Sequence, residues 1–207
     1  MKYIYYALLL SGLGILILRR PRLDKRLYLF IPLLFFTIVT ELISDLKEAY
    51  FLYHINQAIG CTLLCTYYFL LFPTSRYRNL ILLSLVLYLT YFTGFFIRHP
   101  SQFVNFDPVD FVAEGVLITL FSLYYLIDLS MNSGDVHYRR LPHFWIASGN
   151  LLFYSGASLF MAFAFQLRTT NPALYTELSY IAYFLNLVVY SAYIKAFLCH
   201  LPEKTLS

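Results

Sequence analysis

The sequence predicts an all-α membrane protein, a seven-transmembrane-helix bundle that forms a single domain over residues 1–207. Hydrophobic residues make up 60% of the chain and charged residues only 13%, about half the charged share of a soluble domain. The apolar residues fall in long blocks joined by short connections. These observations exclude a soluble globular domain, a disordered chain and a nucleic-acid-binding protein.

Each apolar block is long enough to predict one membrane helix. About 20 residues, each rising about 1.5 Å, cross a hydrocarbon core of about 30 Å. Seven of the eight prolines lie at or outside the block ends, where a residue without an amide N–H is tolerated. Only Pro32 lies inside a block, and we expect a mild kink there. The predicted spans are residues 3–18, 27–44, 51–72, 80–97, 109–129, 144–165 and 178–199.

The first block predicts a retained helix, not a cleaved signal peptide. A signal peptide carries its positive charges before the apolar stretch and a small-residue cleavage site after it. Here the positive cluster Arg19–Arg26 follows the block, and no A-x-A pattern lies directly after it.

Lysine and arginine in the short loops predict the orientation, because cytoplasmic loops are enriched in them. The first, third and fifth loops and the C-terminal tail hold ten of these residues, and the opposite side holds four, with Lys2 counted there. The N-terminus is therefore predicted outside and the C-terminus in the cytoplasm, in a multi-pass membrane protein. The ten are Arg19, Arg20, Arg22, Lys25, Arg26, Arg76, Arg78, Arg139, Arg140 and Lys204.

Polar side chains gather in the outer half of the predicted bundle. A carboxylate at mid-membrane depth costs about 2.5–3.5 kcal/mol, so Glu41 and Glu114 indicate an acidic cavity open to the outer face. His54 is expected to titrate between them. Alternatively, such residues lie at headgroup level or join helices by hydrogen bonds, which is the favoured interpretation for Asp110. The candidate ligand-binding residues are Glu41, His54, Asn56, Gln57, Asp110, Glu114 and Tyr180.

The sequence predicts no catalytic residue, no metal site and no cofactor. His54 is the one histidine inside a span near carboxylates, too few ligands for a zinc site. No G-x-S-x-G, H-E-x-x-H or P-loop pattern occurs. An enzyme is therefore the less favoured class, although it stays open. Tyrosines near the span ends, Tyr5 and Tyr53 among them, are expected in the interfacial aromatic belt.

The sixth predicted span carries a resemblance. The stretch His143–Gly149 (HFWIASG), followed by Tyr154-Ser155-Gly156, resembles an F-W-x-x-x-G…Y-x-G helix of uncharacterised seven-helix inner-membrane proteins of Bacteroidota, often found beside sensor histidine kinases. The layout is also similar to seven-helix sensor modules fused to bacterial histidine kinases. The resemblance covers about fifteen residues of this span, and it implies a sensor role with a separate kinase partner but no catalytic residues.

These observations favour a receptor-like or sensor-accessory membrane protein. A small-molecule ligand, a proton or a lipid group would enter the outer cavity and shift the helices, and a separate signalling partner such as a histidine kinase would read the shift at the basic loops. Membrane lipids are the other expected partners. A small transporter or channel is the alternative, weakened by the scarcity of polar residues in the inner half. A lipid-modifying membrane enzyme is the third class.

Overall fold

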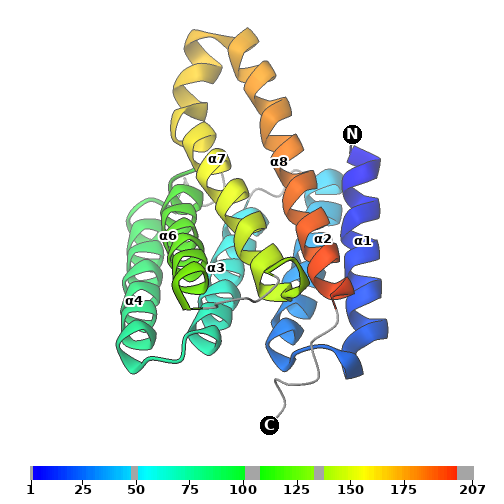
Figure 1. Cartoon of the computed structure of the whole chain (residues 1–207). Coiled ribbons are helices and arrows are strands. Elements are labelled where there is room, and N and C mark those ends of the chain that lie inside the picture. The colour runs from blue at the N-terminus through cyan, green and yellow to red at the C-terminus, as the bar shows by residue number, and fades with distance from the viewer. Residues whose placement is uncertain (1, 48–50, 101–107, 133–137, 200–207) are drawn as a thin grey trace.

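The computed structural model describes residues 2–47, 51–100, 108–132 and 138–199, and in these ranges the chain is helical, without a strand (Figure 1). Seven α-helices and three short 3₁₀ helices make up this part of the chain. In order they are α1 (Lys2–Arg19), η1 (Arg20–Arg22), η2 (Lys25–Leu29), α2 (Phe30–Lys47), α3 (Phe51–Leu71), α4 (Ser75–Arg98), α6 (Val109–Asn132), η3 (Tyr138–Arg140), α7 (Pro142–Thr170) and α8 (Pro172–Leu198).

Several of these helices are long and apolar enough to cross a membrane, so the chain is a multi-pass membrane protein. Among the described residues there are five such segments, and α1 is a shorter apolar helix. α3 has 21 residues but is not one of the five, because polar side chains such as His54, Asn56 and Gln57 interrupt its apolar sequence. The five are Lys25–Ser44, Ser75–Arg98, Val109–Met131, Pro142–Ala164 and Pro172–Leu198.

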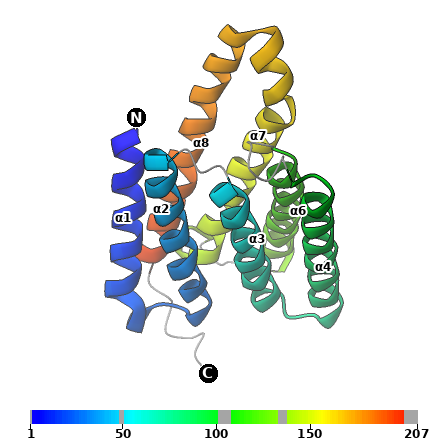
Figure 2. The same ribbon diagram turned by 180° about the vertical axis from the view of Figure 1, so that it is seen from behind.

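Six helices form a ring around the interior of the bundle. Each helix contacts the next in the order α1, α2, α3, α6, α7 and α8, and α8 in turn contacts α1. α4 packs outside this ring against α3 and α6, at the edge of the bundle in both views (Figures 1 and 2). α3 therefore has neighbours in α2, α4 and α6, which shield its polar side chains from lipid.

The two ends of the bundle differ in charge. The α1–α2 connection, the start of α4 and the start of α7 lie at one end, and these segments carry most of the arginines; we call it the basic end. The start of α1 and the α7–α8 turn lie at the opposite end, at the top of Figure 1. Lys204 and the rest of residues 201–207 lie outside the described residues.

The α7–α8 hairpin is longer than the predicted spans 144–165 and 178–199. The helices end at Thr170 and begin at Pro172, so Asn171 is the only residue between them. The Asn171 side chain accepts a hydrogen bond from the Leu174 amide over 3.1 Å, which caps α8, and proline suits the first helical position. The predicted spans ended where hydropathy fell, whereas the helices continue through polar residues and extend beyond the other helices (Figure 1).

Pro32 lies closer to the start of its helix than the predicted span 27–44 placed it. Residues Lys25–Leu29 form the 3₁₀ helix η2, and α2 begins at Phe30 instead of residue 27. Pro32 therefore lies in the first turn of α2, where its missing N–H removes no intrahelical hydrogen bond.

Glycines set the close packing between α7 and its neighbours. A Cβ atom added to Gly149 would lie 2.7 Å from the Cβ of Ala192, and one added to Gly156 would lie 2.6 Å from Leu185 Cδ1. Both contacts join α7 to α8. Leu185 Cδ1 is the end of a flexible side chain and can move aside, whereas the Cβ of Ala192 is fixed to the backbone, so the requirement for glycine is strict at Gly149. The two helices therefore lie closer together at Gly149 than a residue with a side chain would permit.

Candidate functional site

A cavity of about 250 Å³ lies inside the ring of helices, in the half opposite the basic end. Residues from α1, α2, α3, α6, α7 and α8 line it. The sequence analysis predicted contributions from α2, α3, α6 and α8 and missed those of α1 and α7. Five of the predicted ligand-binding residues line this cavity: Glu41, His54, Asn56, Gln57 and Glu114.

Glu41 lies where α1, α2 and α3 meet. Its Oε1 atom accepts a hydrogen bond from the Tyr5 hydroxyl over 3.0 Å, and its Oε2 atom accepts one from the Tyr53 hydroxyl over 3.3 Å. Both tyrosines line the cavity, although the sequence analysis placed them in the aromatic belt. The carboxylate of α2 thus joins two further helices at the cavity wall.

His54 pairs with Asp110 where α3 meets α6. His54 Nδ1 lies 2.7 Å from Asp110 Oδ2, and both side chains are 2% exposed. The Gln57 amide, oriented with its NH₂ group towards this carboxylate, donates to Asp110 Oδ1 over 3.1 Å. Asp110 does not line the cavity; it lies behind the wall and holds α6 to α3.

Glu114 is the more deeply enclosed of the two cavity glutamates, with 2% of its surface exposed. The Tyr154 hydroxyl of α7 donates to its Oε1 atom over 3.1 Å. A Cβ atom added to Gly60 would lie 3.4 Å from the same oxygen, so the glycine leaves room for the carboxylate beside α3. Among the described residues, no lysine, arginine or histidine forms an ion pair with Glu114.

A buried polar network closes the cavity towards the basic end. Tyr193 lines the cavity, and its hydroxyl donates to Asn150 Oδ1. Asn150 Nδ2 donates to the Tyr68 hydroxyl over 3.1 Å. Tyr68 lies 2.6 Å from Ser122 Oγ, which donates to the Ile118 carbonyl. Each group finds a partner, so the network forms a well-satisfied floor. We call Tyr193, Asn150, Tyr68 and Ser122 the floor network.

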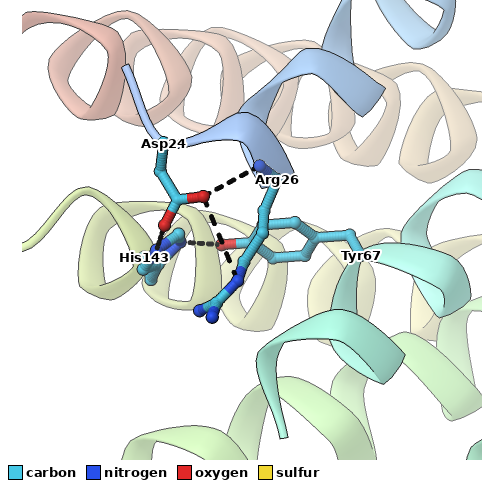
Figure 3. A network of polar contacts seen from close by, with 4 residues as sticks. All are labelled: Asp24, Arg26, Tyr67 and His143. Carbon is cyan, nitrogen blue, oxygen red and sulfur yellow. Dashed lines mark hydrogen bonds and ion pairs between the residues drawn. The ribbon is translucent and has the colours of Figure 1, made fainter. Parts of the chain in front are cut away.

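A second polar cluster lies at the basic end (Figure 3). His143 Nε2 lies 3.1 Å from Asp24 Oδ2, and His143 Nδ1 lies 2.8 Å from the Tyr67 hydroxyl. The Arg26 amide donates to Asp24 Oδ1 over 2.8 Å. The hydrogen bond with His143 lowers the pKa of Asp24 to about 2. The cluster ties the first loop to α3 and α7.

Tyr180, the last predicted site residue, lies outside the cavity and is 55% exposed on α8. The sequence analysis missed the tyrosines that bond the cavity carboxylates and the floor. One indication of these tyrosines is present in the sequence: Tyr190 and Tyr193 are three residues apart within a predicted span. A buried tyrosine normally needs a partner for its hydroxyl, so this spacing indicates a polar interior on that face of the helix.

The half of the bundle towards the basic end also contains more buried polar groups than the sequence indicated. Tyr67, Tyr68 and Tyr193 are 0–4% exposed, and their hydroxyls are hydrogen-bonded within the clusters above. The shortage of inner polar residues is therefore not an argument against the transporter alternative. The floor network counts against the transporter alternative instead, because its buried and hydrogen-bonded side chains close the cavity on the side of the basic end.

Comparisons of the chain with family models, with curated proteins and with solved structures give no match. The site is therefore interpreted from its own geometry. Among the described residues, no group of three or more His, Cys, Asp and Glu side chains is placed to hold a metal ion. What the site offers is a partly open, acidic and aromatic space lined by residues of six helices.

Proposed function

We propose that this protein is a receptor-like or sensor-accessory membrane protein. A small ligand binds in the cavity, and a separate partner reads the resulting change at the basic end. One observation carries the proposal: Glu41 and Glu114, which lie 73 positions apart in the chain, line the same cavity. Carboxylates are expensive inside a membrane, and a cavity that collects two of them is the default candidate for a binding site.

The proposal includes seven spans and an orientation. α1 and α3 join the five long apolar segments, since α3 has enough residues to span and is shielded by its neighbours. The basic end then faces the cytoplasm of a bacterial cell, because short cytoplasmic loops are rich in arginine and lysine. In this orientation the N-terminus is outside, and the cavity lies in the outer half of the inner membrane.

A route from the cavity to the basic end supports a signalling role. α7 and α8 both line the cavity and both continue to the basic end. His143, at the start of α7, contacts Asp24 in the first loop. A ligand that binds one arrangement of α7 and α8 more tightly than another shifts the population towards it. The positions of the arginine-rich first loop and of a histidine-kinase-like partner would shift with it.

The transporter alternative requires a path through the floor network. Tyr68 and Asn150 are fully buried, and the floor network satisfies its own hydrogen bonds. Opening a path would break these buried hydrogen bonds, each with a net contribution of about 0.5–1.5 kcal/mol when water replaces the lost partner. The closed floor therefore favours a receptor over a transporter.

Hydrogen–deuterium exchange of the full-length protein in lipid nanodiscs tests the proposal. The probes are a panel of small amines, carboxylates, sugars and lipid headgroups, and the readout is exchange in the segment 20–29 and at the start of α7. We expect at least one compound to bind and to change exchange at the basic end. The Glu41→Gln/Glu114→Gln double variant should lose this response, and Glu177→Gln, on the exposed outer part of α8, should keep it.

Two outcomes would contradict the receptor proposal. In the first, no compound of any class changes exchange, or the double variant responds like the wild type. In the second, a panel compound crosses the bilayer of proteoliposomes that contain the protein and does not cross protein-free liposomes, which would establish transport instead.

A further inference from the structure

We infer that the cavity takes a small organic ammonium ion, whose charged nitrogen is held at Glu114 and whose apolar part lies among the surrounding aromatic rings. The inference rests on the proposed function and names the chemical class of its ligand.

The charge of the cavity wall is the first reason. Among the described residues that line the cavity there are two glutamates, and there is no lysine or arginine. His54 is the one basic lining residue, and Asp110 lies within 2.7 Å of its ring nitrogen. A proton on His54 is therefore offset by the Asp110 carboxylate and does not neutralise the glutamates. A wall of this composition attracts cations and repels anions.

The acceptors near Glu114 are the second reason. The carboxylate accepts one hydrogen bond, from Tyr154, and carries two oxygens with room for further donors. Asn56 also lines the cavity, and its side-chain oxygen is buried without a hydrogen-bond partner. Asn56 lies one helical turn from Gly60, where an added Cβ atom would lie 3.4 Å from Glu114 Oε1, so both acceptors belong to the same part of the wall. A primary ammonium group donates three hydrogen bonds and matches such acceptors.

Aromatic rings are the third reason. Seven of the lining residues are tyrosine or phenylalanine, and their rings pack against one another: Tyr5 and Tyr190 have centroids 5.5 Å apart, and Phe153 and Tyr154 5.0 Å apart. Aromatic rings attract organic cations through their π electrons and also accommodate apolar groups.

The volume and the ligand set exclude a bare metal ion as the natural occupant. A cavity of about 250 Å³ is slightly smaller than the usual sites for drug-sized ligands, which begin near 300 Å³, so it suits a small organic molecule. The described residues offer no cluster of three or more metal-ligating side chains. A small amine uses the charge, the acceptors and the rings together.

Binding of matched probes to the purified full-length protein in detergent tests the inference. Ethylammonium, 2-phenylethylammonium and 4-phenylbutylammonium are compared at pH 7 with the alcohols of the same carbon skeletons and with 3-phenylpropionate, by calorimetry. We expect at least one ammonium ion to bind about tenfold or more tightly than its alcohol, and the carboxylate not to bind. Glu114→Gln should weaken ammonium binding by about tenfold or more and leave alcohol binding unchanged.

The controls keep the inference falsifiable. Gln at position 114 still accepts from Tyr154, so the variant should keep the thermal stability of the wild type, and Glu177→Gln should bind ammonium like the wild type. If Glu114→Gln fails to fold, the comparison of ammonium with alcohol on the wild type decides alone. Equal binding of the two, or no ammonium binding, overturns the inference. The proposed function survives that result if a carboxylate, sugar or lipid headgroup still changes exchange at the basic end.

Discussion

Replacing Gly149 by alanine tests the packing that holds α7 against α8. The new Cβ atom would lie 2.7 Å from the Cβ of Ala192, about 1 Å closer than an unstrained carbon contact. Neither atom can rotate away, so the helices must separate. Overpacking of this kind costs about 1–3 kcal/mol, and the higher helix propensity of alanine offsets up to about 1 kcal/mol. Near the middle of these ranges about 1–2 kcal/mol of destabilisation remains, and at about 2–4 °C per kcal/mol for a chain of this size the melting temperature should fall by about 2–8 °C.

The assay is thermal unfolding in detergent, followed by the fluorescence of Trp145, the one tryptophan of the chain. Gly94→Ala is the matched control, because nothing lies within 4 Å of a Cβ atom added there; its melting temperature should stay the same or rise. Ala192→Gly added to Gly149→Ala removes the facing methyl group and should restore stability. The reasoning fails if Gly149→Ala melts like Gly94→Ala, or if Ala192→Gly restores nothing.

Two further variants test the polar clusters. Because the pKa of Asp24 is lowered to about 2 by its hydrogen bond with His143, its contribution to stability is present above pH 3.8 and is lost as the pH falls towards 2. Asp24→Asn should therefore melt below the wild type at pH 6, with the gap narrowing below pH 4; a gap independent of pH would contradict this. Tyr193→Phe leaves Asn150 Oδ1 without its donor and should lower the free energy of unfolding by about 1–3 kcal/mol. Tyr183→Phe, on the exposed side of the same helix, should change it little, and equal effects of the two would refute the role of the floor network.

Much of the architecture could be predicted from the sequence because it follows from hydropathy and proline. The seven predicted blocks coincide with the seven described α-helices to within a few residues at most ends. The prediction was least accurate where a helix continues through polar residues. Thr170 and Pro172 belong to helices although hydropathy had already fallen, because an asparagine cap and proline geometry decide where these helices end and begin, not lipid solubility.

The site was predicted in part, and for a physical reason. Carboxylates and amides inside apolar blocks are conspicuous, so Glu41, Glu114 and Asn56 could be selected, and the structure places all three at one cavity. Pairing between helices is not visible in a single sequence. His54 therefore appeared to belong with the glutamates, whereas Asp110 on α6 is its partner.

The positions of the tyrosine side chains also could not be predicted from the sequence. In sequence a tyrosine of the membrane interface looks the same as one whose hydroxyl is bonded in the interior. Tyr5 contacts Glu41 because α1 packs beside α2 in the folded bundle, and nothing in its local sequence indicates this.

Thiol labelling in intact cells tests most directly whether the cavity is acidic and open to the outer face. Asn186 lines the cavity on α8, and the protein carrying Asn186→Cys and Cys199→Ser keeps only the buried native thiols Cys61 and Cys65. We expect a membrane-impermeant cationic methanethiosulfonate reagent added outside to label this cysteine faster than an anionic one. Adding Glu114→Gln should reduce the difference. Labelling only from the cytoplasmic side, or faster labelling by the anionic reagent, would contradict the account.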